Sequence, residues 1–355
     1  VGFTFPYLAL QPIGAGYILS NLTGGAIPYF WGATALTVFI IFYVFLGGMR
    51  SVAATDVKQG LLMIVLMSVA VFWLAKKFGG ITEANLAVYA KEPELFSMAG
   101  RDGYFNPQRW FSLCLLWLAC VPMFPQLFMR FYAARNLRAL KSATLLYALI
   151  PCFLFLLPVM IGLMGHLSFP GLEGKAADQI LPMMLREHTP VWFATLVMTG
   201  ALAAFMSTLD SQLLALSTIF TRDVYVALLK PRASLGQQVR VGRLLVILFA
   251  LVGLLIAYRP FDTIFDIAKL AFSGYAALFP VTLALLYWRK HTSATACMLA
   301  IAAGESINVA AYLGWIPQAW MLGFEPFFWM MLVEFGILGV RGIKKTPEVA
   351  KTSGV

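Results

Sequence analysis

Residues 200–225 read GALAAFMSTLDSQLLALSTIFTRDVY, an apolar run in which small and hydroxyl side chains recur at helical spacing. The positions i, i+3, i+4 and i+7 of one helical face hold Ala204, Ser207, Thr208 and Ser211. Asp210 stands beside this face. A carboxylate inside an apolar run is costly to bury without a partner or an ion. The run therefore predicts a membrane helix whose polar face has a function.

The composition of the whole chain agrees with a membrane protein. Of the 355 residues, 61% are hydrophobic and only 12% are charged, and the mean hydropathy is +0.82. Soluble domains have about 25% charged residues, so a water-soluble fold is excluded. Long unbroken apolar runs predict spanning helices, whereas a membrane β-barrel would need short alternating strands. We therefore expect an all-α, polytopic fold in contact with a lipid bilayer.

Ten apolar runs are long enough to span a membrane. They cover residues 1–20, 26–47, 57–75, 107–129, 139–166, 190–220, 239–257, 262–288, 292–313 and 324–340. We expect one transmembrane domain over residues 1–345, followed by a tail over 346–355. The chain begins with Val1 and enters an apolar run at once, so we expect an N-terminal truncation.

The basic residues indicate an orientation rather than a nucleic-acid partner. The net charge is +10, but the Lys and Arg residues lie between apolar runs and form no basic soluble face. One alternating set of connections holds seventeen of them and the other set holds eight. The positive-inside rule places the richer set and the C-terminus in the cytoplasm. The connections 76–106 and 167–189 then lie outside, either as gating loops or as solvated loops.

Hydroxyl groups and backbone carbonyls supply oxygen ligands that suit sodium, without a fixed charge that would hold the ion permanently. The alternative for the polar face of 200–225 is a close helix interface, in which hydroxyls bond back to the preceding turn.

The same stretch resembles the signature of the sodium:solute symporter family. A second motif of that family resembles residues 47–59, GGMRSVAATDVKQ. Further similarity runs through residues 6–16, 125–131 and 279–288. The resemblance implies a LeuT-type core of two inverted repeats. Predicted helices one to three would end the first repeat, four to eight would form the second, and nine and ten would be additions. The family's leading helices would be missing.

The resemblance also implies functional residues. Ala204, Ser207 and Thr208 match positions that supply oxygens to the family's common sodium site. Asp56, Asp210 and Ser211 fall where some members have a second cation site. Asp210 stands where those members have Ser, so the alternatives for this site are a second sodium, a proton or neither. From the residues alone, Asp56 could instead cap a helix that starts after the Gly47–Gly48 loop.

Two arginines near these motifs have a simpler interpretation. Arg50 and Arg130 are expected to anchor the protein at its cytoplasmic side. In the ninth and tenth predicted helices, Glu305 and Glu334 are expected to serve packing or assembly.

The fourth predicted helix contains Pro122 and Pro125, and each proline removes a backbone donor. We expect a helix that is broken, as at transporter substrate sites, or merely kinked. Trp117 and Phe124 beside these prolines are candidate substrate contacts or core residues. Gln11, in the middle of the first run, is a candidate substrate contact or one side of an interhelical hydrogen bond.

The eighth predicted helix holds Lys269 about 10 Å from its start near Asp262. A lysine at that depth needs a partner. A local ion pair with Asp262 or Asp266 is one interpretation, and contact with an anionic substrate such as a carboxylate is the other. This helix lines the substrate in some members of the family, so Tyr275 is a further candidate contact.

The function implied is secondary active symport of a small organic solute with Na⁺ as the coupling ion and no other cofactor. The family also contains membrane sensors, an alternative that would need a long soluble C-terminal extension. An enzyme would need clustered catalytic groups, whereas His166, His188 and His291 are far apart in the sequence. The four cysteines indicate neither disulfide nor zinc. We expect a multi-pass protein of the plasma membrane, the inner membrane of a bacterium.

Overall fold

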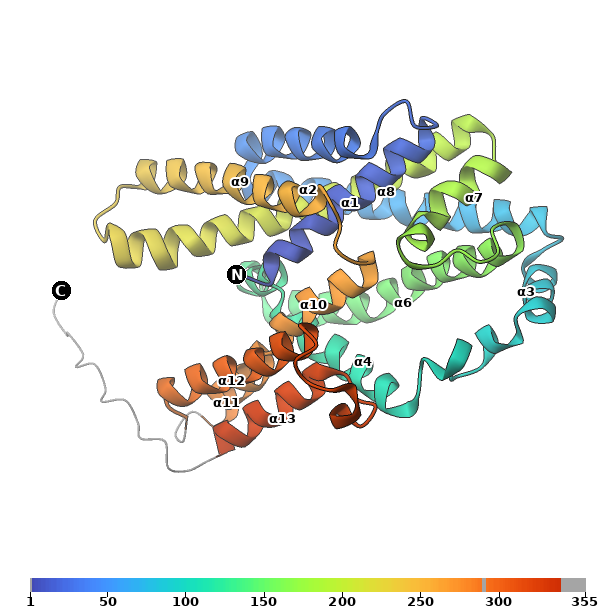
Figure 1. The fold of residues 1–355 in the computed structure, drawn as a ribbon. Coiled ribbons are helices and arrows are strands. Elements are labelled where there is room, and N and C mark those ends of the chain that lie inside the picture. Colours follow the sequence, from blue (N-terminus) through green and yellow to red (C-terminus); the bar gives the residue numbers. More distant parts are fainter. Residues whose placement is uncertain (1, 289–291, 340–355) are drawn as a thin grey trace. The chain divides into compact units, whose positions relative to one another are not determined.

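A computed structural model describes residues 2–288 and 292–339, without the side chains of 46–54. The described residues form helices and connecting loops, with no strand among them (Figure 1). The α-helices are α1 (Thr4–Leu22), α2 (Tyr29–Lys77), α3 (Ile81–Lys91), α4 (Pro107–Cys120), α5 (Pro125–Ala133), α6 (Leu137–Ser168), α7 (Ile180–His188), α8 (Val191–Ile219), α9 (Leu235–Ala257), α10 (Ile264–Ala276), α11 (Leu278–Tyr287), α12 (Ala294–Tyr312) and α13 (Pro326–Gly339). The all-helical prediction is confirmed.

Short helical turns join several of these helices. Those of the 3₁₀ type are η1 (Pro93–Phe96), η2 (Arg101–Gly103), η3 (Val121–Met123), η4 (Gly174–Gln179) and η6 (Gln318–Met321). The π-helix η5 (Phe220–Leu229) continues α8 without a break.

Each of the ten predicted apolar runs coincides with a helix or a pair of helices. Six are long and apolar enough to cross a membrane among the described residues, or seven if the bent pair formed by 107–123 and 125–133 counts as one span. Two further apolar helices, Tyr29–Phe45 and Pro326–Gly339, are shorter. By these criteria the described residues contain fewer spans than the ten predicted runs.

Helix α2 contains two of the predicted runs. Its 49 residues would extend about 74 Å at about 1.5 Å per residue. That length is more than twice the roughly 30 Å of a hydrocarbon core. The two apolar portions, Tyr29–Phe45 and Thr55–Lys77, are therefore separate candidate crossings.

The chain divides into two compact units, and the first combines Val1–Phe96 with Phe128–Ala268. Within it, α8 packs against α2, α1 and α9, and α1 packs against α2 and α9. Small residues allow this close approach: a Cβ atom added to Gly200 would come within 2.8 Å of Leu66, and one added to Gly14 would collide with the ring of Phe205. Helix α8 is thus held on several sides by neighbouring helices.

The second unit combines Ser97–Leu127 with Lys269–Val355. In its described part, α12 packs against α13, and α11 contacts α4, α12 and α13. Glu334 is fully buried in α13 and lies against Gly304 of α12, where any side chain would collide with its carboxylate. This contact agrees with the packing role predicted for Glu334.

Many large apolar side chains are exposed along the long helices. Phe42, Leu118 and Leu255 are 67%, 65% and 74% exposed. Soluble monomers rarely leave extended apolar surfaces uncovered. The exposed faces therefore suit contact with lipid chains.

Candidate functional site

The polar face of α8 forms one group of oxygen atoms. Thr208 Oγ1 donates a hydrogen bond to the Ala204 carbonyl at 3.1 Å, and Ser207 Oγ donates to the same carbonyl at 3.4 Å. All three residues are half-buried. A hydroxyl has one donor and two acceptor positions, so each hydroxyl that donates to Ala204 keeps lone pairs for another group.

This geometry fits two roles, helix packing and cation binding. Bonding back to the preceding turn is what the packing interpretation predicts for these hydroxyls. The same arrangement collects three oxygen atoms within one helical turn, which is the kind of ligand set a hard cation prefers. The geometry therefore fits both a packed helix interface and a sodium site.

One turn further along α8, a network of charged groups joins three helices. Arg130 of α5 donates through Nη2 to Asp56 Oδ2 of α2 at 2.5 Å and to Ser211 Oγ of α8 at 2.7 Å. Ser211 Oγ also lies 3.4 Å from Asp56 Oδ2. The Arg130 side chain is 41% exposed, whereas that of Asp56 is 15% exposed. The guanidinium group therefore reaches inward from a more open position.

Asp210 lies next to this network and is fully buried. Its Oδ2 atom accepts a hydrogen bond from the hydroxyl group of Tyr43 in α2. Asp210 Oδ1 and Asp56 Oδ1 are buried and have no hydrogen-bond partner among the described residues. A buried acceptor without a partner is costly, so both oxygens are suited to receive a proton or a cation.

The structure corrects two sequence interpretations here. The interpretation of Asp56 as a helix cap is wrong, because α2 is helical on both sides of it and begins at Tyr29. The contact between Arg130 and Asp56 was not predicted, since Arg130 was interpreted as a cytoplasmic anchor. The 74 residues that separate them give no local signal. Arg50 lies outside the described side chains, and His291 and the tail 346–355 lie outside the described residues.

The predicted break in the fourth helix is confirmed. Helix α4 ends at Cys120, η3 follows, and the segment from Pro107 to Met123 meets α5 at an angle of 50°. Phe124 has extended backbone angles at the break, with φ −59° and ψ 124°. Pro122 and Pro125 flank this point, where each lacks the amide hydrogen that a continuous helix needs.

Three candidate substrate residues belong to one chain of aromatic contacts in the second unit. The ring centroid of Phe272 lies 5.2 Å from that of Trp117 and 5.1 Å from that of Phe124. Phe124 also contacts Tyr275 edge to face at 5.3 Å. Phe272 was missed in the sequence analysis, although it lies three residues before Tyr275 on the same helix. Trp117 is 39% exposed and the others are buried.

Lys269, one turn before Phe272, has a partner that the sequence did not indicate. Its Nζ atom lies 3.5 Å from Glu325 Oε2, on the segment just before α13. Glu325 Oε1 accepts a hydrogen bond from Arg109 Nε at 2.9 Å. The Glu325 side chain is 9% exposed, and its backbone amide donates to Ser112 Oγ at 3.1 Å. Two cations therefore share one well-fixed carboxylate.

Gln11 is buried in α1, where Pro12 interrupts the backbone hydrogen bonds. Proline cannot donate to the carbonyl four residues earlier, which is that of Leu8. With its amide nitrogen facing these carbonyls, Gln11 donates to Leu8 O at 3.1 Å and to Tyr7 O at 2.6 Å. The side chain therefore satisfies the carbonyl that Pro12 leaves free, within its own helix.

The connection 167–189 contains the helical segments η4 and α7, and it is attached to the start of α10. Asp178 Oδ2 accepts a hydrogen bond from the backbone amide of Ile264 at 3.0 Å, and Lys175 Nζ donates to Pro260 O at 2.5 Å. Partial burial raises the pKa of Asp178, and the neighbouring Asp266 and Asp262 raise it further, against the lowering effect of the Ile264 amide. Asp178 thus caps a helix 86 residues away.

Comparison with known proteins gives a consistent result. A model of the sodium:solute symporter family matches residues 2–304. The sodium/pantothenate symporter of Haemophilus influenzae is 29% identical over 81% of this chain, and the sodium/proline symporter of Escherichia coli is 27% identical over 90% of it. The chain spans 59% and 63% of the length of these two relatives.

The fold is also similar to a solved structure, described as the substrate-bound outward-open state of a Na⁺-coupled sialic acid symporter. The TM-score is 0.69 at 21% identity, over 96% of this chain and 72% of that one. This match confirms the LeuT-type fold that the motifs implied. Symporters are transporters and not enzymes. With most of its length matched by the family model, the chain belongs to the sodium:solute symporter family.

Proposed function

We propose that this protein takes up a small organic solute by secondary active symport, driven by a sodium gradient and working by alternating access. The observation that carries the proposal is the group of three oxygens on α8, from Ala204, Ser207 and Thr208. Their remaining lone pairs would bind Na⁺ without a permanent charge. The membership of the chain in a symporter family supports this use of the polar face over simple packing.

A second cation site is proposed at Asp56, Asp210 and Ser211. The two buried carboxylate oxygens without a hydrogen-bond partner would gain one from a bound cation. Arg130 already neutralises the other oxygen of Asp56. We propose that the guanidinium group holds this place when the cation is absent and withdraws toward its exposed side when the cation binds. Such an exchange would couple ion binding to movement of α5, the second half of the broken helix.

The proposed substrate carries a carboxylate. Proline, pantothenate and sialic acid, named for the similar proteins, are all carboxylic acids. Lys269 supplies a cation of the required sign, and the aromatic group of Trp117, Phe124, Phe272 and Tyr275 supplies apolar surface beside it on the same unit. Gln11 is a weaker candidate because its amide is used within α1.

The proposed location is the plasma membrane, as the inner membrane of a bacterium, with the C-terminus in the cytoplasm. The distribution of basic residues supports this orientation, and the relatives named above come from bacteria. Sodium and solute would then enter from the side of the connections 76–106 and 167–189.

Sodium titration of uptake into proteoliposomes tests the sodium site. Ser207→Ala and Thr208→Ala should each raise the sodium concentration for half-maximal uptake roughly three- to tenfold, since each removes one oxygen ligand worth about 1 kcal/mol. Thr195→Ala and Thr199→Ala are matched controls. These threonines are exposed on α8 and bond back to the preceding turn in the same way.

Unchanged sodium dependence in both site variants, with reduced thermal stability, would assign the polar face to packing and overturn the proposed sodium site. An equal shift in the control variants would mean that any back-bonded hydroxyl of α8 influences sodium indirectly. Substrate affinity at saturating sodium should stay close to that of the unaltered protein.

A further inference from the structure

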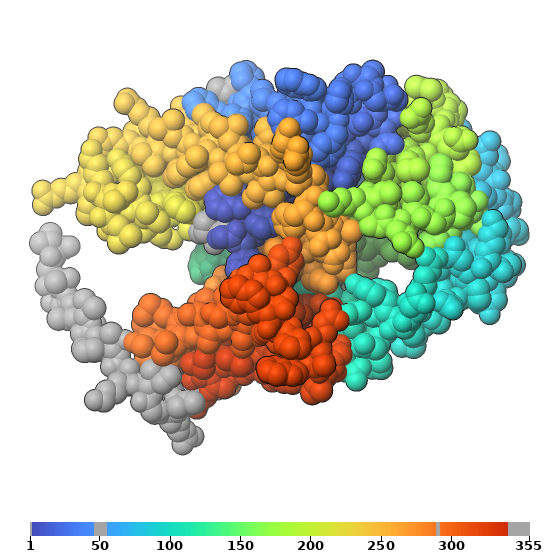
Figure 2. Space-filling view, in the orientation of Figure 1, coloured from blue at the N-terminus to red at the C-terminus, as the bar shows by residue number. Residues whose placement is uncertain are grey.

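A cavity of about 440 Å³ lies in the first unit, away from the residues discussed so far. Its volume is within the range of small-molecule sites. It is bounded by the end of the apolar portion Tyr29–Phe45, the end of α8, the π-helix η5 and the first half of α9. The yellow surface in Figure 2 shows that η5 and the start of α9 reach the outside of the molecule.

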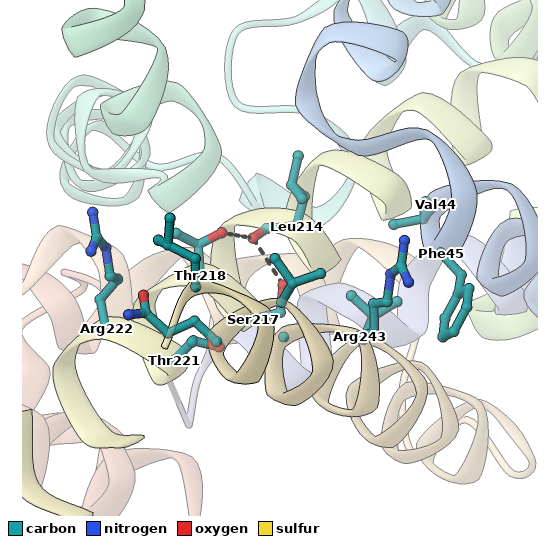
Figure 3. A pocket seen from close by; sticks show the side chains of 13 residues that line it. Val44, Phe45, Leu214, Ser217, Thr218, Thr221, Arg222 and Arg243 are labelled. Carbon is teal, nitrogen blue, oxygen red and sulfur yellow. Dashed lines mark hydrogen bonds between the residues drawn. The ribbon is translucent and has the colours of Figure 1, made fainter. Parts of the chain in front are cut away.

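Hydroxyl groups line the centre of this cavity (Figure 3). Ser217 Oγ and Thr218 Oγ1 both donate to the Leu214 carbonyl, at 3.0 and 2.7 Å. Thr221 is only 6% exposed, and its Oγ1 atom has no hydrogen-bond partner among the described residues. A buried hydroxyl without a partner is costly, so Thr221 indicates that a polar ligand belongs in this cavity.

Two arginines stand at opposite ends of the row of hydroxyls, Arg222 on η5 and Arg243 on α9 (Figure 3). The Arg243 guanidinium lies over the ring of Phe45, 4.8 Å from its centroid. No aspartate or glutamate lines the cavity, and no ion pair of either arginine occurs within the described part of the chain. The site therefore carries two positive charges and an unpaired hydroxyl donor.

The remaining wall is apolar and partly open. Val44 and Val246 are buried in it, whereas Leu235 and Val239 are 78% and 54% exposed. The connection between η5 and α9 belongs to the set of connections rich in Lys and Arg, which is predicted to be cytoplasmic. The cytoplasmic leaflet of a membrane contains anionic lipids, and basic pockets between helices on that side bind their headgroups.

The local helix geometry supports a specific site. The segment Phe220–Leu229 is a π-helix, and π-helical turns are rare and frequent at functional sites. Because the turn of a π-helix is wider than that of an α-helix, Thr221 and Arg222 do not continue the side-chain spacing of α8. Because η5 continues α8, a ligand bound here would also fix the cytoplasmic end of the helix that carries Ser207 and Thr208.

We propose that this cavity binds the phosphate group of an anionic phospholipid. The guanidinium groups of Arg222 and Arg243 bind the phosphate oxygens from two sides, Thr221 donates to the same group, and the acyl chains run along Leu235 and Val239. The proposal does not depend on which solute the protein carries.

Lipid retention tests the site directly. The purified protein is exchanged into nanodiscs of phosphatidylcholine with a small fraction of phosphatidylglycerol, and the lipids that stay with the protein after transfer to detergent are counted by native mass spectrometry. The double variant Arg222→Gln/Arg243→Gln should bind phosphatidylglycerol at least about tenfold more weakly. The matched control is Arg232→Gln/Arg240→Gln, which removes two exposed arginines that do not line the cavity, one in the connection after η5 and one in α9.

Thr221→Val provides a second test that leaves the charge unchanged, and it should weaken retention by a smaller factor. Equal retention in all variants, or an equal loss in the control double variant, would overturn the proposal, because binding would then follow total charge. A separate arm adds inorganic phosphate to the detergent-solubilised protein and measures its melting temperature. Stabilisation by phosphate that matches stabilisation by phosphatidylglycerol would overturn the lipid as the source and assign a soluble phosphate compound.

Discussion

Two groups of charged residues, one in each unit, differ in the sign of their charge. In the first unit, Asp56 pairs with the guanidinium of Arg130, and Asp210 is buried beside it with a hydrogen bond from Tyr43. One carboxylate oxygen of each aspartate has no hydrogen-bond partner among the described atoms. In the second unit, Arg109 and Lys269 share one carboxylate, that of Glu325. With all groups ionised, the first group has one negative charge in excess and the second has one positive charge in excess.

The excess charge of each group favours a different kind of ligand. Buried charges are stable only when they are paired, so an excess charge inside a membrane protein favours an ion of opposite sign. Under the proposed function, the first group would bind a cation and the second an anion. A symporter that moves sodium together with a carboxylate needs both properties. The two groups can therefore be tested separately by neutralising one charge in each.

The largest effect is expected from Asp56→Asn. This change removes the charge that would attract a cation to the proposed second site, and it leaves the Arg130 guanidinium without its anion. Charged hydrogen bonds contribute about 1.5–3 kcal/mol, so sodium affinity should fall at least about tenfold. Binding of radioactive ²²Na⁺ to the purified protein measures the sodium affinity. Glu83→Gln, at an exposed position of α3, is the control. Unchanged sodium binding in Asp56→Asn would remove Asp56 from the ion site.

Lys269→Gln should produce the next largest effect, on the substrate. Affinity for a carboxylate substrate should fall roughly three- to tenfold, because one of two cations is lost while Arg109 still pairs with Glu325. Sodium affinity should change little. Competition by a panel of carboxylic acids and their amides measures the preference for charge. The control is Arg259→Gln, which removes an exposed cation a few residues before α10.

Unchanged substrate binding in Lys269→Gln would contradict the proposed contact between Lys269 and the substrate. Unaltered affinity and unaltered preference between acids and amides, together with a lower melting temperature, would restrict Lys269 to an ion pair that stabilises the fold. The second charged group would then have no role in binding an anionic substrate.

The smallest effect is expected at Asp178, a carboxylate held by a backbone amide instead of by a cation. Its pKa is raised from the ordinary value of 3.8, chiefly by burial. A raised pKa in the folded state contributes stability below the unfolded value, and this contribution is lost as the pH rises through the folded value. The unaltered protein should therefore gain more stability between pH 7 and pH 4 than Asp178→Asn, as melting temperatures at both pH values would measure.

Asp178→Asn keeps an acceptor for the Ile264 amide, whereas Asp178→Ala removes it and should cost about 1 kcal/mol at both pH values. Sodium and substrate dependence should be the same in both variants and in the unaltered protein. A change in sodium dependence would show that a carboxylate outside the first charged group also influences the ion. Sodium binding could then not be assigned to the first charged group alone.

The sequence alone predicted the helical fold well because its signal is local. A run of about 20 apolar residues must form a helix in lipid, and Pro122 and Pro125 predict that one of these helices is broken or kinked. The positions of the ten runs and the break after Cys120 follow from these rules. The family motifs likewise depend on neighbouring residues, as in 200–225 and 47–59, so membership of the family could be recognised before the fold was known.

Tertiary structure alone decided which charges pair. Asp56 contacts Arg130 and Ser211, and Lys269 contacts Glu325, across separations of 56 residues or more in the sequence. Ion pairs depend on the distance between side chains in space, which no local pattern encodes. The same holds for Asp178, which caps α10 from another connection, and for the cavity between η5 and α9. The sequence determined the helices and the family because those depend on neighbouring residues, whereas only packing brought distant charges within reach of each other.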